Sequence, residues 1–440
     1  MKIHTSLISA LLLIIFNIPL GAQQKWSLEE CIDYAHKNNL QIKQQEIAVK
    51  QAETGVKESK LDFIPSFNAS LGHNFNWGKS VNINDLEIIT NQLTQSTTAN
   101  ISTSTPIIEG LSKHYSLKSS RTQLQISQQE VEKLKNEISI AITQAYLQVL
   151  LAIEIEKSAE QSYKSVEQQR ARTGVLVDAG SQPYSSLLDI EAQLAAELVQ
   201  LVAARNDIKS NLLTLMQLME IPQEEGFDVE IPLFDDSTAH FIHEDIASIF
   251  DKALSLPQIK SAELQLKKSM YDYKIQKGQL FPSISFTAGY GTYFSDSQNS
   301  AFFDQFNENR NPSIGLSLSI PIFNGWRRGS ALRNAGYSVE NAEIELKRRH
   351  NTLYKEIQQA NNNAENSFAK CKAAMHNMKA SRESFNYVES KFNTGVLNST
   401  DYIVAKTNLF KAESEYYQSK FQYIFQLKIL DFYKGIPIKL

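Results

Sequence analysis

The segment from Gly325 to Gly395 contains no proline, and this feature most constrains what the chain can fold into. About seventy residues without proline can form a helix of roughly 100 Å, at 1.5 Å per residue. Within the segment, apolar and small residues alternate at spacings of four and three, as in Leu353, Ile357 and Ala360. This is the spacing of a coiled-coil seam, so the segment predicts a helical rod too long for a compact domain.

The residues that precede this rod predict a strand with two different faces. In the segment 313–325, large apolar side chains alternate with serine, glycine and proline, which is the two-residue period of a strand. Segments 63–77, 93–107 and 284–294 alternate in the same way, the second of them more weakly, and a polar loop is expected at 295–311. Strands of about ten residues are long enough to cross a bilayer when they are tilted.

The first residues have the composition of a secretory signal. Lys2 precedes an apolar core, and small residues end at Ala22, which predicts a signal peptide at 1–22. No cysteine stands at that boundary, so lipoprotein processing is not expected, and no later apolar segment near 18 residues is expected to span a membrane as a helix. The formal net charge of -4 comes without a basic run, which argues against a nucleic-acid partner.

The chain is predicted to be one structural unit written twice. Gly110 and Gly325 each follow a predicted strand, Gly180 and Gly395 each interrupt a helical run, and both pairs are 215 residues apart. The predicted domains are a signal peptide (1–22), a first repeat (23–225, with a β-hairpin at 63–107), a linker (226–245) and a second repeat (246–440, with a β-hairpin at 281–323). Each repeat is expected to contain a long helix and an antiparallel return helix, at 110–179 and 184–219 and then at 325–395 and 400–432.

Four strands cannot close a barrel by themselves, and an open strand edge is not tolerated in hydrocarbon. Several copies must therefore pool their strands, and closed symmetric oligomers are the usual solution. The fold class expected is mainly α with membrane β: a helical coiled-coil tube joined to a β-barrel that is shared between subunits. The alternative is a soluble helical protein with two exposed hairpins.

The signal peptide, the duplication, the Pro106–Gly110 and Pro321–Gly325 segments and the glycines at 180 and 395 resemble the TolC family of outer-membrane efflux proteins, the outer membrane factors. The resemblance implies a homotrimer in the outer membrane, with a barrel of twelve strands and a helical tunnel through the periplasm. It also implies a periplasmic adaptor and an inner-membrane RND or ABC transporter as partners, for efflux or type I secretion. The alternative function is a coiled-coil adhesin or stalk without transport.

By the same resemblance, the periplasmic aperture is narrowed by carboxylates six and nine residues after the second tip glycine. Those positions are Asp401 and Val404, so only the first acid is present, and Ser186 and Asp189 are the equivalents in the first repeat. A ring of Asp401 side chains would attract cations, or Asp401 could simply complement a helix dipole. Asp189 could equally lie on a solvated helix face, and Phe392 could line the aperture or complete the seam.

The tips of the helical hairpins, at Gly180–Ser181 and Gly395–Val396, are expected to meet the adaptor, and their glycines also end helices. Trp77 and Trp326 are expected as membrane-interface aromatics, with Arg327 and Arg328 on the periplasmic side. Trp326 could instead pack on the helix that follows it.

No catalytic residue, metal or cofactor is predicted. His240, His243 and Glu244 form a close ionisable cluster, but they lie in an irregular linker without the spacing of a helical zinc site. Cys31 and Cys371 could form a disulfide or remain buried thiols, because nothing in their spacing pairs them.

Overall fold

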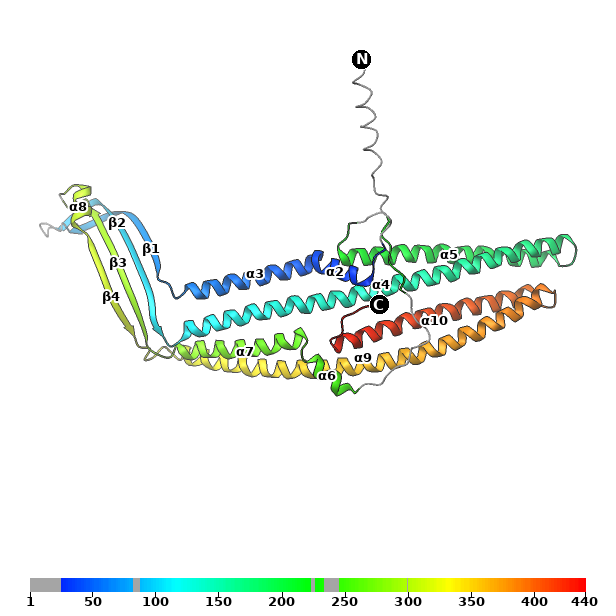
Figure 1. Ribbon diagram of the computed structural model, residues 1–440. Coiled ribbons are helices and arrows are strands. Elements are labelled where there is room, and N and C mark those ends of the chain that lie inside the picture. Colours follow the sequence, from blue (N-terminus) through cyan, green and yellow to red (C-terminus); the bar gives the residue numbers. More distant parts are fainter. Residues whose placement is uncertain (1–24, 82–87, 223–225, 233–244, 299) are drawn as a thin grey trace, which may run out of the picture. The chain divides into compact units, whose positions relative to one another are not determined.

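The computed structural model describes residues 25–81, 88–222, 226–232, 245–298 and 300–440 (Figure 1). The signal peptide, part of the linker and the cluster of His240, His243 and Glu244 lie outside these residues. The helices are α2 (Leu28–Asn38), α3 (Leu40–Leu61), α4 (Ser112–Asp178), α5 (Tyr184–Met219), α6 (Ile246–Ala253), α7 (Pro257–Gly278), α8 (Phe302–Glu308), α9 (Arg327–Asn393) and α10 (Ser399–Tyr433). The strands are β1 (Ser66–Val81), β2 (Ile88–Glu109), β3 (Ser283–Ser295) and β4 (Asn311–Ser319).

The order of elements repeats along the chain. The series α2, α3, β1, β2, α4, α5 is followed by α6, α7, β3, β4, α9, α10, with α8 inserted between β3 and β4. The long helices α4 and α9 both contain 67 residues. The described residues divide into two compact units, one made of those within 45–130 and 257–349 and the other of those within 25–44, 131–256 and 350–440.

The unit of residues 45–130 and 257–349 contains one antiparallel sheet, in the order β1, β2, β3, β4. The register lines up the apolar residues of the four strands on one face of the sheet. Phe67 lies opposite Thr103, which lies opposite Ala288, which lies opposite Ile314. The next residue on each strand forms the other face, in the row Asn68, Ser102, Gly289 and Ser313. The predicted division into one apolar and one polar face is confirmed.

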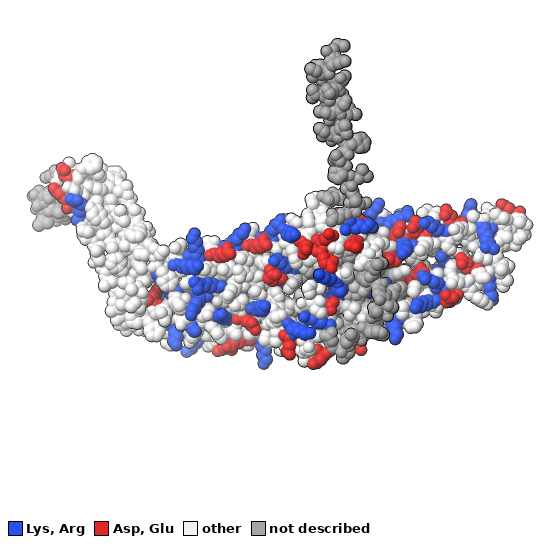
Figure 2. Space-filling view, viewed as in Figure 1, with Lys and Arg blue, Asp and Glu red and all other residues white. Residues whose placement is uncertain are grey.

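The apolar face of this sheet is open to the surroundings. Leu71 is 77% exposed, Trp77 78%, Ile314 82% and Leu316 72%. In the view of Figure 2 the region of the sheet carries almost no charge, whereas lysines, arginines and acids cover the helices. Among the described strands, β1 and β4 each have a neighbour on one side only, so the sheet has two open edges.

Two glycines allow the strands to join the helices closely. Gly110, at the end of β2, has a φ of 54°, and a Cβ there would collide with the backbone of Gly278 at the end of α7. Further along the same two helices, the hydroxyl of Ser119 on α4 donates a hydrogen bond to the carboxylate of Asp272 on α7 (2.6 Å).

The other unit is built from packed helices. The predicted seam residues Leu353, Ile357 and Ala360 of α9 are 2%, 0% and 5% exposed. In α4, Tyr146 is 1% exposed, and its hydroxyl lies 2.7 Å from the carbonyl oxygen of Glu230. Cys31 is buried, and burial raises the pKa of its thiol to about 12. Within the described residues no disulfide joins Cys31 to Cys371.

Three expectations need correction. The helix α4 does contain an 18-residue window apolar enough to cross a membrane by length and composition, but half of that window is buried inside the protein. The fourth strand ends at Ser319 rather than Gly325, because Pro321 has no N–H for the ladder, and Gly325 and Trp326 both have positive φ. The segment 295–311 is not only a polar loop, because it contains α8.

Candidate functional site: hairpin tips and strand-to-helix junction

The two hairpin tips have the same backbone geometry. Gly180 and Gly395 have φ values of 72° and 77°, which favour glycine. The N–H of Ser181 donates to the carbonyl of Leu176 (2.8 Å), and the N–H of Val396 donates to the carbonyl five residues back (3.0 Å). These bonds form a Schellman motif at each tip. Ser181 and Val396 are exposed, so both tips are free to be contacted.

An apolar cluster below the tips joins α4, α5, α9 and α10. Phe392 is 2% exposed, and its ring stacks on that of Tyr402 at 5.0 Å between centroids. The other buried members are Val166, Ile190, Phe385 and Leu409. Phe392 therefore packs inside the seam in this structure, which is the second of the two roles considered for it.

Asp401 lies at the edge of a groove between α9 and α10. The groove has a volume of about 660 Å³, and its lining includes Asp401, Val404, Ser381 and Ser384. Asp401 is exposed, and its backbone N–H donates to the side chain of Asn398, which caps α10 (2.8 Å). The carboxylate therefore stands in the first turn of a helix, where it complements the dipole and remains open to the surroundings.

Asp189 connects the two return helices. Its carboxylate accepts a hydrogen bond from the hydroxyl of Ser399 at the start of α10 (2.8 Å), and Ser399 is buried. Asp189 is therefore more than a solvated position on the face of α5. Ser186 is half-buried one turn before it. No sequence pattern pointed to Ser399, because a serine in the first turn of a helix is ordinary.

Lys406 is a buried charge that the sequence analysis missed. It is 7% exposed, and its ammonium lies 4.8 Å from the centre of the Phe385 ring. Burial lowers the pKa of Lys406, and the nearby carboxylates Glu197, Glu389 and Glu413 only partly oppose this effect. A lysine on the apolar side of α10 is the signal that could have identified it.

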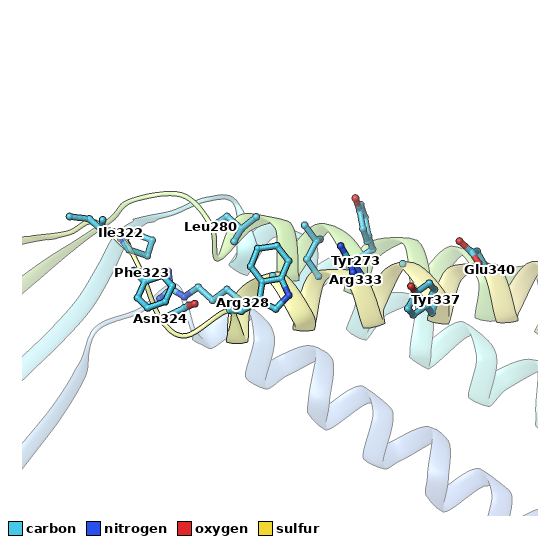
Figure 3. Close-up of a pocket in the computed structure, with 14 residues that line it drawn as sticks. Tyr273, Leu280, Ile322, Phe323, Asn324, Arg328, Arg333, Tyr337 and Glu340 are labelled. Atoms are coloured by element: carbon cyan, nitrogen blue, oxygen red, sulfur yellow. The ribbon is translucent and has the colours of Figure 1, made fainter.

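The junction between β4 and α9 holds Trp326 against α9, the helix that follows it. The guanidinium of Arg333 lies 5.9 Å from the centre of the indole, and a Cβ at Gly329 would lie only 3.0 Å from that ring. Beside it is a cavity of about 670 Å³, to which Phe323 and Arg328 contribute (Figure 3). Trp326 thus packs on the helix that follows it, although 62% of its surface stays exposed.

A sheet that carries almost no charge and exposes one apolar face has the pattern that is typical of membrane strands. The family model for outer membrane efflux proteins matches residues 31–219 and 252–432. The chain belongs to the outer membrane efflux protein family.

Individual relatives agree with this assignment. Outer membrane protein TolC of Salmonella enteritidis is 21% identical over 284 residues, which are 64% of this chain and 57% of TolC. The alkaline protease secretion protein AprF of Pseudomonas aeruginosa is 23% identical over 322 residues, which are 71% of this chain and 64% of AprF. The chain therefore matches less than two thirds of the length of either relative, 57% of TolC and 64% of AprF. The crystal structure of CusC has a TM-score of 0.79 at 15% identity, covering 93% of this chain and 92% of CusC.

The family membership confirms three predictions: the resemblance itself, the outer-membrane location and the absence of enzymatic activity, since the family consists of transport channels.

Proposed function

We propose that three copies of the chain form an outer-membrane exit duct. In this trimer, β4 of one copy pairs with β1 of the next, and the polar face of the sheet lines the channel. The observation that carries this proposal is the sheet itself, with an apolar face such as that of Leu71 and Leu316 exposed and both edges open. Closing the ring satisfies the edge N–H and C=O groups, which hydrocarbon would otherwise leave unpaired.

The helical hairpins extend this duct into the periplasm, and their tips at Gly180–Ser181 and Gly395–Val396 meet a periplasmic adaptor. An inner-membrane RND or ABC transporter supplies the cargo, in tripartite efflux or type I secretion. Support comes from the family, which is described as outer membrane efflux proteins, and from the name of one relative, which is a protease secretion protein. The exposed Schellman turns are the surfaces available for docking.

The duct is tested by purification from outer-membrane fractions and reconstitution into planar bilayers. A trimer with stable single-channel conductance is expected. A monomer without conductance would refute the proposal.

Docking is tested by placing a photo-crosslinking amino acid at Ser181 or Val396, with Val199, which is 69% exposed on α5, as a control. Crosslinks to an adaptor from the two tip positions, absent from Val199, are expected. Equal labelling at all three positions would contradict docking at the tips.

A further inference from the structure

The short helix α8 lies at the end of the sheet where β3 ends (Figure 1), and it carries a cluster of aromatic side chains. The ring of Phe302 lies 4.8 Å from that of Phe294 on β3 and 4.7 Å from that of Phe306. Gln305 is 1% exposed and fixes the helix, because its side chain accepts from the N–H of Ser295 (2.9 Å) and donates to the Ser295 carbonyl (3.0 Å). The helix therefore has a defined position on the sheet.

Two contacts place α8 on the apolar face of the sheet. Phe294 lies opposite Thr97, which lies opposite His73, and His73 shares a face with Leu71. Phe294, which packs against α8, is thus on the apolar face. Two residues earlier on the same face, the hydroxyl of Thr292 donates to the carbonyl of Phe306 (2.7 Å).

Aromatic side chains continue across this end of the same face. Phe75 and Trp77 on β1 are 48% and 78% exposed, and Phe75 packs edge-on against His73 (4.6 Å). On α8, Phe303 is 82% exposed although it is large and apolar. Bands of aromatic residues are typical of the level where a barrel leaves the hydrocarbon and meets the headgroups.

We propose that α8 is an interfacial anchor, which lies in the outer leaflet against the lipid-facing side of the barrel with Phe303 in contact with lipid. The helix then does not cover the mouth of the channel, even though it belongs to the loop between the last two strands. This inference rests on the proposed function, because it requires that the apolar face contacts lipid. The partner is the boundary between acyl chains and headgroups, which suits aromatic rings.

The two sides of α8 provide a matched test. Glu308 follows Phe303 by five residues, so it lies about 140° away around the helix at 3.6 residues per turn, and it is exposed. A nitroxide label is attached at F303C or E308C in the full-length chain, after Cys31→Ala and Cys371→Ala remove the native thiols. Leu316→Cys, on the apolar face of β4, serves as the reference for lipid contact.

The labelled trimers are reconstituted in vesicles of phosphatidylethanolamine and phosphatidylglycerol, and power saturation compares collisions with oxygen and with a water-soluble nickel chelate. The label at 303 is expected to shift toward oxygen, as the label at 316 does, whereas the label at 308 favours nickel. Nickel access at 303 equal to that at 308, with lipid contact at 316, would overturn the anchor and leave the duct intact. Nickel access at 316 would overturn both.

Discussion

Adjacent residues on β4 offer a direct test of which face of the sheet contacts lipid. Leu316 lies opposite Phe286 on the apolar face, and Ser317 lies opposite Ser285 on the polar face. The two positions share the same strand, depth and backbone environment. Replacing each in turn by arginine therefore changes mainly the medium into which the charge is placed.

The expected costs differ widely. An arginine facing lipid costs about 2–4 kcal/mol near the midplane, and less near either interface. Removing a leucine side chain whose apolar surface is covered by lipid adds about 1.5–3 kcal/mol. Leu316→Arg should therefore destabilise the inserted barrel by about 4–7 kcal/mol, or roughly three to five powers of ten in the folding equilibrium. Ser317→Arg faces a watery channel and should change stability by about 0.5 kcal/mol or less.

The assay is urea-driven unfolding of the purified protein in phospholipid vesicles, together with the amount of trimer in outer-membrane fractions. Leu316→Arg should lower the unfolding midpoint and deplete the trimer, whereas Ser317→Arg should assemble and alter ion selectivity. Equal effects of the two substitutions would refute the assignment of the faces. A larger effect of Ser317→Arg would reverse it.

Three further predictions concern the hairpin tips. Phe392→Ala should destabilise the packing around it by about 3–5 kcal/mol, which should appear as faster amide exchange at the start of α10. The control Val396→Ala should leave the exchange rates unchanged. Equal exchange rates in the two variants would contradict the buried stack of Phe392 on Tyr402. Burial lowers the pKa of Lys406 in the folded chain below its ordinary value of 10.5. Between the folded and the unfolded pKa, the unfolded chain binds more protons than the folded chain, so the free energy of unfolding rises with pH in that window. Lys406→Met should stabilise the hairpins and remove this slope in urea titrations at successive pH values, and an unchanged slope would count against the assignment. Asp401→Asn should weaken cation selectivity or block by multivalent cations in planar bilayers; no change in either would assign Asp401 to the helix terminus alone.

Much of the fold was predictable because its signals are local. The return helix was expected at 184–219, and α5 spans Tyr184–Met219, because Pro183 and Pro222 flank it. The two-residue period alone predicted which residues of each strand share a face. The register of the sheet then places the apolar faces of all four strands on the same side. The proposed signal peptide and the division into repeats and linker stay predictions.

The features that could not be predicted from the sequence depend on contacts between residues far apart in the chain. The helix α8 has seven residues, too few for a periodic pattern, and Gln305 holds it through bonds to another segment. The hydrogen bond from Ser399 to Asp189 joins residues 210 positions apart. Lys406 is buried only because α10 packs against α5 and α9, and no single-helix pattern specifies which neighbours it will meet.

The lengths of the edge strands bear on how a ring of copies closes. β1 has 16 residues and β4 has nine, so part of β1 extends beyond β4 of the neighbouring copy in any register. Unpaired backbone groups in that part cannot lie bare in hydrocarbon. The described chain places α8 immediately before β4, at the end where β4 is missing. When the overhang lies at the end where β4 begins with Asn311, α8 and the aromatic residues Phe75 and Trp77 lie at that same end of the sheet, and the anchor extends the apolar surface beyond the short strand.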